Sequence, residues 1–221
     1  MARHTRVATD VVELARSVVL AAPFFAHVSG HVLDQPHVRL RTDDGRNYLL
    51  LTPRRYDVVT ADIIQPIHAG AGNLYSREYF TLARHVLKED GLMLQWIGHR
   101  EEVHYKLIMR TFLEVFPNAT LWSNGTLMVG SLQPLTISRS AFARRVADTD
   151  TRFALMQVGL DTFEALLARY TAGPDEMRRF VGEGPILTDD RPLLEYHRSI
   201  DGGRAVDVSS LKGDVTPRVR P

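Results

Sequence analysis

The sequence predicts an α/β fold: an open sheet with helices on both faces, followed by a small C-terminal helical appendage. Strand-like and helix-like stretches alternate from Arg6 to Ser131, as they do in sheets whose strands are joined by crossover helices. The run 56–64 (YDVVTADII) is almost continuously apolar, which is typical of a central parallel strand buried on both faces. From Leu132 onward, helix-like stretches follow one another without strands between them.

Each element has its own local signal. Strands are predicted at 6–14, 37–42, 56–64 and 92–97 from their β-branched and apolar content. The segments 119–122 and 126–131 flank Asn124-Gly125, a dipeptide that favours a hairpin turn. Helices are predicted at 17–33 (interrupted by Pro23), 45–51, 76–87 and 101–116, and KEDG (88–91) is expected to close the third of these with a glycine cap.

Composition limits the class of protein. With 221 residues, 44% of them apolar and 24% charged, the chain has the profile of a soluble globular protein. A net charge of +1 is too small to indicate a nucleic-acid partner, and the absence of cysteine excludes disulfides, cysteine-ligated zinc and thiolate catalysis. No apolar stretch approaches the ~20 residues of a membrane span. We therefore expect a cytoplasmic protein without a transmembrane segment in this chain, and we predict no metal site.

Polar residues stand at or just beyond the ends of the predicted strands, where open α/β sheets bind ligands. A carboxylate at Glu13 offers two acceptor oxygens to the paired hydroxyls of a ribose. Asp44-Gly45 offers an acceptor and a bare backbone to an adenine edge. Asp62 and Gln95 follow on neighbouring strands. The structural alternatives are a helix cap and turn at Asp44 and a solvated strand end at Glu13.

Four stretches together carry a family resemblance: DVVELARSVVLAAPFF, VLDQPHVRLRTDDGRNYLL, RYDVVTADIIQP and NLYSREYFTLARHVLKEDGLMLQW. In order and spacing, from Val7 to Tyr196, the chain resembles the catalytic domain of the spermidine synthase (polyamine aminopropyltransferase) family. The closing LTDDRPLLEY resembles the larger bacterial members, in which this domain follows a multi-span transporter-like membrane region. We interpret TDDRP (188–192) within it as an acidic turn before a packed strand rather than a cation site.

The resemblance implies a methyltransferase-type Rossmann sheet and transfer of an aminopropyl group from decarboxylated S-adenosylmethionine to a polyamine acceptor, leaving methylthioadenosine. Decarboxylated S-adenosylmethionine is a co-substrate and methylthioadenosine is its product, and no permanently bound cofactor is implied. The resemblance makes Glu13 the ribose-binding acid, places Asp44 and Gly45 on the adenine side, and makes Asp62 the catalytic acid. It places three residues in the substrate pocket: Gln65, Tyr75 and Gln95.

A carboxylate at Asp62 suits this chemistry. It can accept a proton from the attacking ammonium, which exposes the nitrogen lone pair for in-line displacement at the carbon next to the sulfonium. Its negative charge also attracts a cationic amine and a cationic sulfonium. The alternative is a buried aspartate that caps the following loop.

The chain departs from the family pattern in two ways. Gln65 stands where the family has a second acid, so diamine recognition is weakened and the acceptor need not be putrescine. The family's first strand and its glycine-rich loop should precede Val7, and this sequence does not contain them. We therefore expect a sheet lacking its first strand, impaired transfer, and an unpaired strand edge that a homo-oligomer or a completing partner chain would cover.

These observations predict three regions: residues 1–131 as a partial catalytic domain, 132–200 as a helical extension and 201–221 as a disordered tail. Two other functions remain open. An S-adenosylmethionine-dependent methyltransferase would share the sheet, and a non-catalytic remnant or interaction module would explain the absent glycine-rich loop.

Overall fold

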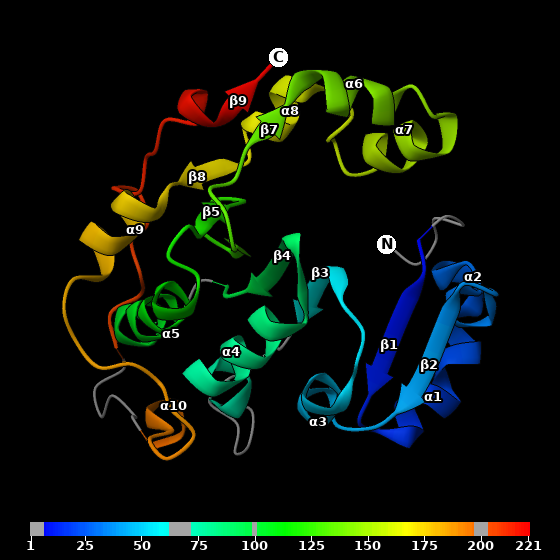
Figure 1. The fold of residues 1–221 in the computed structure, drawn as a ribbon, viewed down its shortest axis with the longest axis horizontal. Coiled ribbons are helices and arrows are strands. Elements are labelled where there is room, and N and C mark those ends of the chain that lie inside the picture. The colour runs from blue at the N-terminus through cyan, green and yellow to red at the C-terminus, as the bar shows by residue number, and fades with distance from the viewer. Residues whose placement is uncertain (1–6, 62–71, 99–100, 197–202) are drawn as a thin grey trace.

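The computed structural model describes residues 7–61, 72–98, 101–196 and 203–221 (Figure 1). The mixed α/β fold expected from the sequence is confirmed, but the described strands form three sheets instead of one. β1 (Thr9–Glu13) and β2 (Val38–Thr42) form a parallel pair. The main sheet has five strands in the order β3-β4-β6-β5-β8, and β7 pairs with β9. Within the described ranges, no helix is both long and apolar enough to cross a membrane.

The first part of the chain packs around the β1–β2 pair. Four short helices connect these strands, with a 3₁₀ turn at the proline, where an α-helix would lose a hydrogen bond: α1 (Arg16–Ala21), η1 (Ala22–Phe25), α2 (Ala26–Ser29) and η2 (Val32–Asp34). α3 (Gly45–Leu51) follows β2. No apolar residue in the range 7–51 is buried, and nine large apolar side chains here are exposed: Val7, Leu14, Val18, Leu20, Phe24, Phe25, Val28, Leu50 and Leu51. This unit therefore has no apolar core of its own.

The five-stranded sheet carries the core. β3 (Tyr56–Ala61) runs parallel to β4 (Leu87–Trp96), which is antiparallel to β6 (Leu127–Ser131). β5 (Thr120–Trp122) joins β6 and β8 (Tyr170–Ala172). The predicted hairpin between β5 and β6 is confirmed, and Asn124 and Gly125 both have positive φ, 54° and 86°.

Three helices cover the main sheet and its hydrophobic core. They are α4 (Arg77–Val86), α5 (Glu102–Val115) and α9 (Pro174–Val181) (Figure 1). Between α4 and α5, the rings of Phe80 and Phe112 meet edge to face with their centroids 4.9 Å apart, and both side chains are fully buried. This geometry adds to the stabilisation from burial. A preceding 3₁₀ turn, η3 (Gly72–Tyr75), leads into α4, which Ser76 caps.

The prediction that 56–64 forms a central strand buried on both faces is wrong. β3 lies at the edge of the main sheet, and Val59 is its only buried residue. An apolar run makes a strand suitable for burial, but burial also needs a neighbour, and among the described strands only β4 pairs with β3. The expected single sheet is therefore divided between β1 and β3.

The predicted role of KEDG as a helix end is also wrong. α4 ends at Val86 and β4 begins at Leu87, so residues 88–91 lie inside the strand. They form an irregularity, because the pairing passes from Tyr56 with Leu87 to Val58 with Leu92. A Cβ atom at Gly91 would lie 2.9 Å from two backbone oxygens, one of them that of Tyr56. The glycine permits close strand approach instead of capping a helix.

The C-terminal part is more ordered than predicted. Its helices α6 (Arg139–Val146), α7 (Thr149–Met156) and α8 (Phe163–Leu167) are accompanied by β7 (Ile137–Ser138) and β8, so the expected run of helices without strands is wrong. After α10 (Leu193–Tyr196), residues 203–221 were expected to be disordered. Instead they bury Leu211 and end in η4 (Thr216–Arg218) and β9 (Val219–Arg220), which pairs with β7. A few well-placed contacts order a segment whose composition is polar.

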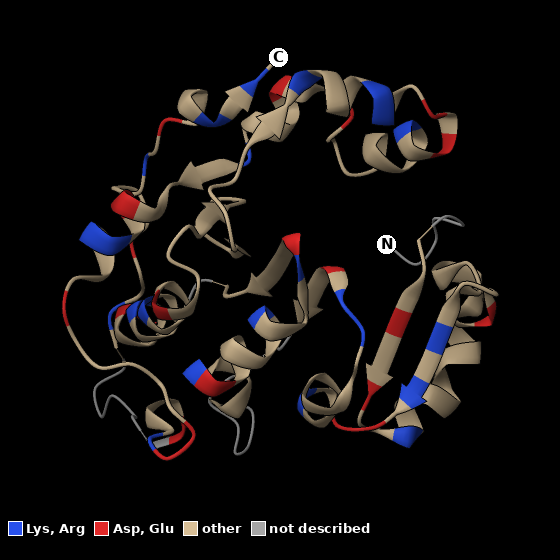
Figure 2. Cartoon of the chain, in the orientation of Figure 1, with Lys and Arg blue, Asp and Glu red and all other residues tan. Residues whose placement is uncertain are grey.

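The buried carboxylate of Asp10 joins the β1–β2 pair to the five-stranded sheet. Figure 2 shows an acidic band on β1 beside basic bands on β2. Here Asp10, with a side chain only 4% exposed, accepts a hydrogen bond from Arg39 Nε at 2.5 Å. It also accepts from Tyr56 of β3 at 2.7 Å and from Tyr48 of α3 at 3.1 Å. Burial alone would raise the pKa of Asp10, but the hydrogen bonds from Arg39, Tyr56 and Tyr48 outweigh it and lower the pKa.

We expect Asp10→Ala to lower the free energy of unfolding by about 2–3 kcal/mol, because hydrogen bonds to a charged group are lost. Since its folded-state pKa is lowered, the contribution of Asp10 should be complete above pH ~4 and lost as the pH falls through the folded-state pKa. Urea unfolding of both proteins between pH 7 and pH 3 measures this. Asp57→Ala is the control, because Asp57 is exposed and pairs only with the exposed Lys88. Equal losses in the two variants would contradict the assignment.

The edge of β3 that no described strand pairs and the exposed apolar side chains around α1, η1 and α2 predict self-association. Apparent mass measured by light scattering should rise with protein concentration. Thr60→Lys, which places a charge on an exposed position of β3, should reduce this rise, whereas Thr81→Lys on α4 should not. A monodisperse monomer at all concentrations would argue against an accessible edge.

Candidate active site

The two acids predicted to bind a nucleoside lie on adjacent segments. β1 ends at Glu13, and the chain after β2 continues through Asp43 into Asp44. The backbone N–H of Asp43 donates to the backbone oxygen of Glu13 at 3.1 Å. The parallel pairing of β1 and β2 therefore brings the carboxyl ends of both strands together.

Only one of the two carboxylate oxygens of Glu13 accepts a hydrogen bond from the described residues. Its Oε1 accepts a hydrogen bond from the backbone N–H of Ala15 at 2.7 Å. Within the described residues its Oε2 has no hydrogen-bond partner, and the side chain is half-buried. One carboxylate oxygen thus fixes the side chain at the strand end while the second stays available to a hydroxyl group.

Asp44 has the capping role named above as an alternative. Its Oδ1 accepts from the backbone N–H groups of Arg46 at 2.8 Å and Asn47 at 3.0 Å, so it caps α3. At Gly45, a Cβ atom would meet nothing within 4 Å. No protein contact therefore requires glycine there, and the space above this backbone is open to a ligand. Capping uses one oxygen of Asp44, which is compatible with a second role.

The predicted amine-side residues differ in their settings. Gln95 is fully buried in β4, and its Nε2 donates to the Trp96 backbone oxygen at 3.2 Å. Its Oε1 is buried without a hydrogen-bond partner among the described residues, an arrangement that costs free energy unless another group supplies a donor. Gln95 is in register with Ala61, the last described residue of β3. Tyr75 is fully buried in η3 as part of the hydrophobic core. The predicted residues Asp62 and Gln65 lie outside the described residues.

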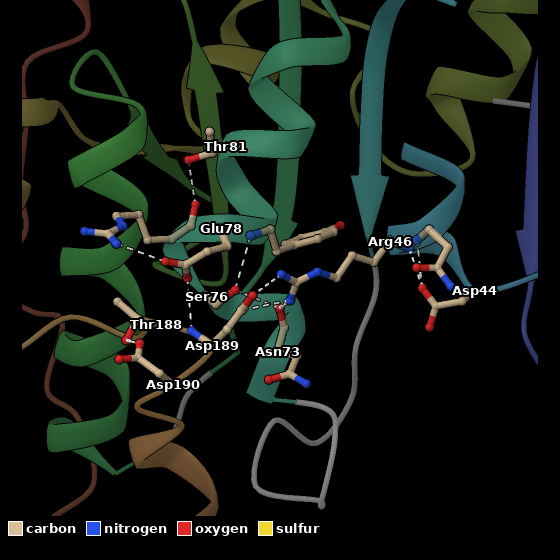
Figure 3. A network of polar contacts seen from close by, with 12 residues as sticks. Asp44, Arg46, Asn73, Ser76, Glu78, Thr81, Thr188, Asp189 and Asp190 are labelled. Atoms are coloured by element: carbon tan, nitrogen blue, oxygen red, sulfur yellow. Dashed lines mark hydrogen bonds and ion pairs between the residues drawn. The ribbon is translucent and has the colours of Figure 1, made fainter. Parts of the chain in front are cut away.

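Sequence reasoning missed a residue beside this site. Arg46, in the first turn of α3, forms a two-point ion pair with Asp189 of the closing segment (residues 187–196) (Figure 3). It also donates to the backbone oxygen of Asn73 at 3.1 Å. TDDRP is followed by the short helix α10 instead of the expected strand. Arg46 and Asp189 are 143 positions apart, so no local pattern could have indicated their contact.

Comparison with known proteins then identifies the family. Residues 2–120, more than half of the chain, match the spermine/spermidine synthase domain. The chain belongs to this family. Among curated proteins, the polyamine aminopropyltransferase of Korarchaeum cryptofilum is 28% identical over 219 residues, covering 89% of this chain and 64% of the relative. That of Hamiltonella defensa is 29% identical over 163 residues, covering 69% and 55%.

Solved structures agree on the fold of this spermine/spermidine synthase family member. A probable spermidine synthase from Corynebacterium glutamicum superposes with a TM-score of 0.55 at 19% identity, covering 81% of this chain and 63% of the other. A spermidine synthase in complex with the transition-state analogue AdoDATO has a TM-score of 0.51 at 21% identity, covering 60% and 50%. The chain spans less than two thirds of the length of the relatives and structures cited here.

The capping role of Asp44 can be tested by substitution. Asp44→Ala should lower the free energy of unfolding by about 1 kcal/mol through the lost cap, whereas Asp44→Asn should keep most of it, because asparagine caps equally well. Both variants remove the charge. Chemical unfolding of the three proteins at pH 7 tests this, and equal destabilisation by alanine and asparagine would show that the cap contributes little.

Proposed function

We propose that this chain binds the nucleoside of decarboxylated S-adenosylmethionine and transfers its aminopropyl group to a polyamine. Membership of the spermine/spermidine synthase family is the observation that carries the proposal. The adjacency of Glu13 and Asp44 at the carboxyl ends of β1 and β2 supports it, because each keeps an oxygen free of described partners. On this proposal, Glu13 accepts from the ribose hydroxyls, and Asp44 with Gly45 faces the adenine.

The transfer step needs a base and a cation-attracting group beside the amine. We assign this role to Asp62, directly after Ala61 of β3. Its carboxylate takes a proton from the ammonium, and the freed lone pair forms a bond to the aminopropyl carbon that is attached to sulfur. The carbon–sulfur bond breaks, its electron pair stays on sulfur, and methylthioadenosine leaves as a neutral thioether.

Gln95 fits the amine side of the same reaction. Its buried Oε1 is an acceptor without a donor among the described residues, and Gln95 is in register with Ala61, the residue that precedes Asp62 in the sequence. A bound amine would supply the missing donor and offset the cost of the unpaired oxygen. Gln65 and Tyr75 remain predicted pocket residues. Because Gln65 stands where the family has a second acid, we expect diamine binding to be weaker, and the acceptor need not be putrescine.

Two substitutions test the division of roles. Glu13→Gln should weaken methylthioadenosine binding by about 1.5–3 kcal/mol, because it removes a charge-assisted hydrogen bond. Asp62→Asn should instead lower turnover by about 100- to 10,000-fold and leave nucleoside affinity nearly unchanged. Calorimetric titration of methylthioadenosine and a product assay with a series of diamines measure the two effects.

The same assays decide between the open alternatives. Methyl transfer from ordinary S-adenosylmethionine, without aminopropyl transfer from the decarboxylated form, would establish a methyltransferase. Failure of the unsubstituted chain to bind methylthioadenosine would favour the third alternative, a non-catalytic remnant or interaction module. Full turnover by Asp62→Asn at neutral pH would remove that residue from the mechanism.

A further inference from the structure

Arg46 lies where three parts of the chain meet. It follows the Asp44 cap of α3 by two residues, and its guanidinium reaches both η3 and the closing segment (Figure 3). Toward η3 it donates to the backbone oxygen of Asn73. Toward the closing segment it binds both carboxylate oxygens of Asp189. One side chain thus joins the nucleoside side of the candidate site to the turn that leads into α4.

The closing segment is itself held firmly against the start of α4. The backbone N–H of Arg77 donates to the Leu187 oxygen at 2.9 Å, and that of Asp189 donates to Glu78 Oε2 at 3.1 Å. Leu187 is buried, and its N–H donates to the buried hydroxyl of Thr111 at 2.9 Å. Asp189 is therefore presented to Arg46 from an anchored backbone.

The same segment also packs closely against η3. A Cβ atom at Gly72 would lie 2.9 Å from Oε1 and 3.3 Å from Cγ of Glu195. Any larger residue at position 72 would have to displace that side chain. The closing segment thus lies against the start of η3 at Gly72 through Glu195, and Arg46, which binds Asp189, contacts the next residue, Asn73.

Simple surface ion pairs contribute little to stability, but this pair differs from them. Although the Asp189 side chain is 42% exposed, that of Arg46 is only 23% exposed, and its planar fork makes two parallel bonds to one carboxylate, the strong geometry for arginine. The hydrogen bond from Arg46 lowers the pKa of Asp189, and the same contact raises the pKa of Arg46. Both groups stay charged throughout the neutral range.

We propose that the Arg46–Asp189 pair positions the nucleoside-binding end of α3 relative to η3 and the start of α4. Arg46 and Asp189 are positioning residues, since they act through Asp44 and the η3 backbone and not on the reacting atoms. This inference rests on the proposed function for its effect on binding. The coupling of the three segments is a separate claim that can be measured without any ligand.

The chain offers a matched control. Asp190 adjoins Asp189 and carries the same charge, but its carboxylate accepts from Thr188 at 2.7 Å. Asp189→Asn should accelerate amide hydrogen exchange in peptides covering residues 44–51 and 72–80 of the full chain, whereas Asp190→Asn should not. Arg46→Lys keeps the charge but loses the fork, so it should give an intermediate effect.

Methylthioadenosine calorimetry on the same proteins supplies the second measurement. Asp189→Asn should weaken binding by about 2- to 30-fold, the range seen when a coupling network is disturbed away from the ligand. Asp190→Asn should bind like the parent. The double variant Arg46→Asp/Asp189→Arg, which restores opposite charges, should recover part of the affinity, a rescue that general destabilisation would not produce.

The outcomes separate the two claims. Equal exchange rates in Asp189→Asn and Asp190→Asn would overturn the coupling. Faster exchange with unchanged nucleoside affinity would overturn the positioning role. If the parent chain binds no nucleoside, the proposed function fails together with the effect on binding, and the exchange rates still decide whether the pair couples the three segments.

Discussion

The β1–β2 unit depends on ionic contacts for its attachment to the rest of the molecule. Strands in one sheet are held by backbone pairing along their edges, but β1 and β3 belong to different sheets. The Asp10 carboxylate takes over part of that task by accepting from β2, β3 and α3 at once. Arg46 provides a second attachment from α3 to η3 and the closing segment. No apolar residue in the range 7–51 is buried, and in this range only Leu49 packs against the main core, so apolar burial adds little to either contact.

This arrangement has consequences for the proposed site. Glu13 and Asp44, the nucleoside side, belong to the β1–β2 unit, whereas Ala61 and Gln95, the amine side, belong to the main sheet. The relative position of the two sides is therefore set by Asp–Arg and Asp–Tyr contacts. Such contacts respond to pH and salt more strongly than a packed apolar interface does. The candidate site is divided along the same line as the sheet.

The sequence predicted the features that local patterns determine. The Asn124-Gly125 hairpin and α3 appeared as expected because turn residues and helix caps act over a few positions. The neighbours of β3 could not be predicted, since an apolar pattern shows what a strand can bury and not which strand lies beside it. The Arg46–Asp189 pair escaped detection because it is a tertiary contact between distant segments. Of the site, the strand-end positions of Glu13 and Asp44 followed from topology, whereas the capping bonds of Asp44 needed coordinates.

On the proposed function, the division of the sheet also bears on the rate of aminopropyl transfer. In-line displacement requires the amine nitrogen and the carbon next to sulfur at near-attack distance, and an error of ~1 Å can cost on the order of 100-fold in rate. The acids can be correct in kind and still act slowly if the two sides move relative to each other. A covering strand between β1 and β3 would replace side-chain bridges with two ladders of backbone hydrogen bonds, at a spacing of about 4.8 Å per strand. Turnover should therefore depend on the rigidity of the attachment between the two sheets at least as much as on the identity of the acids.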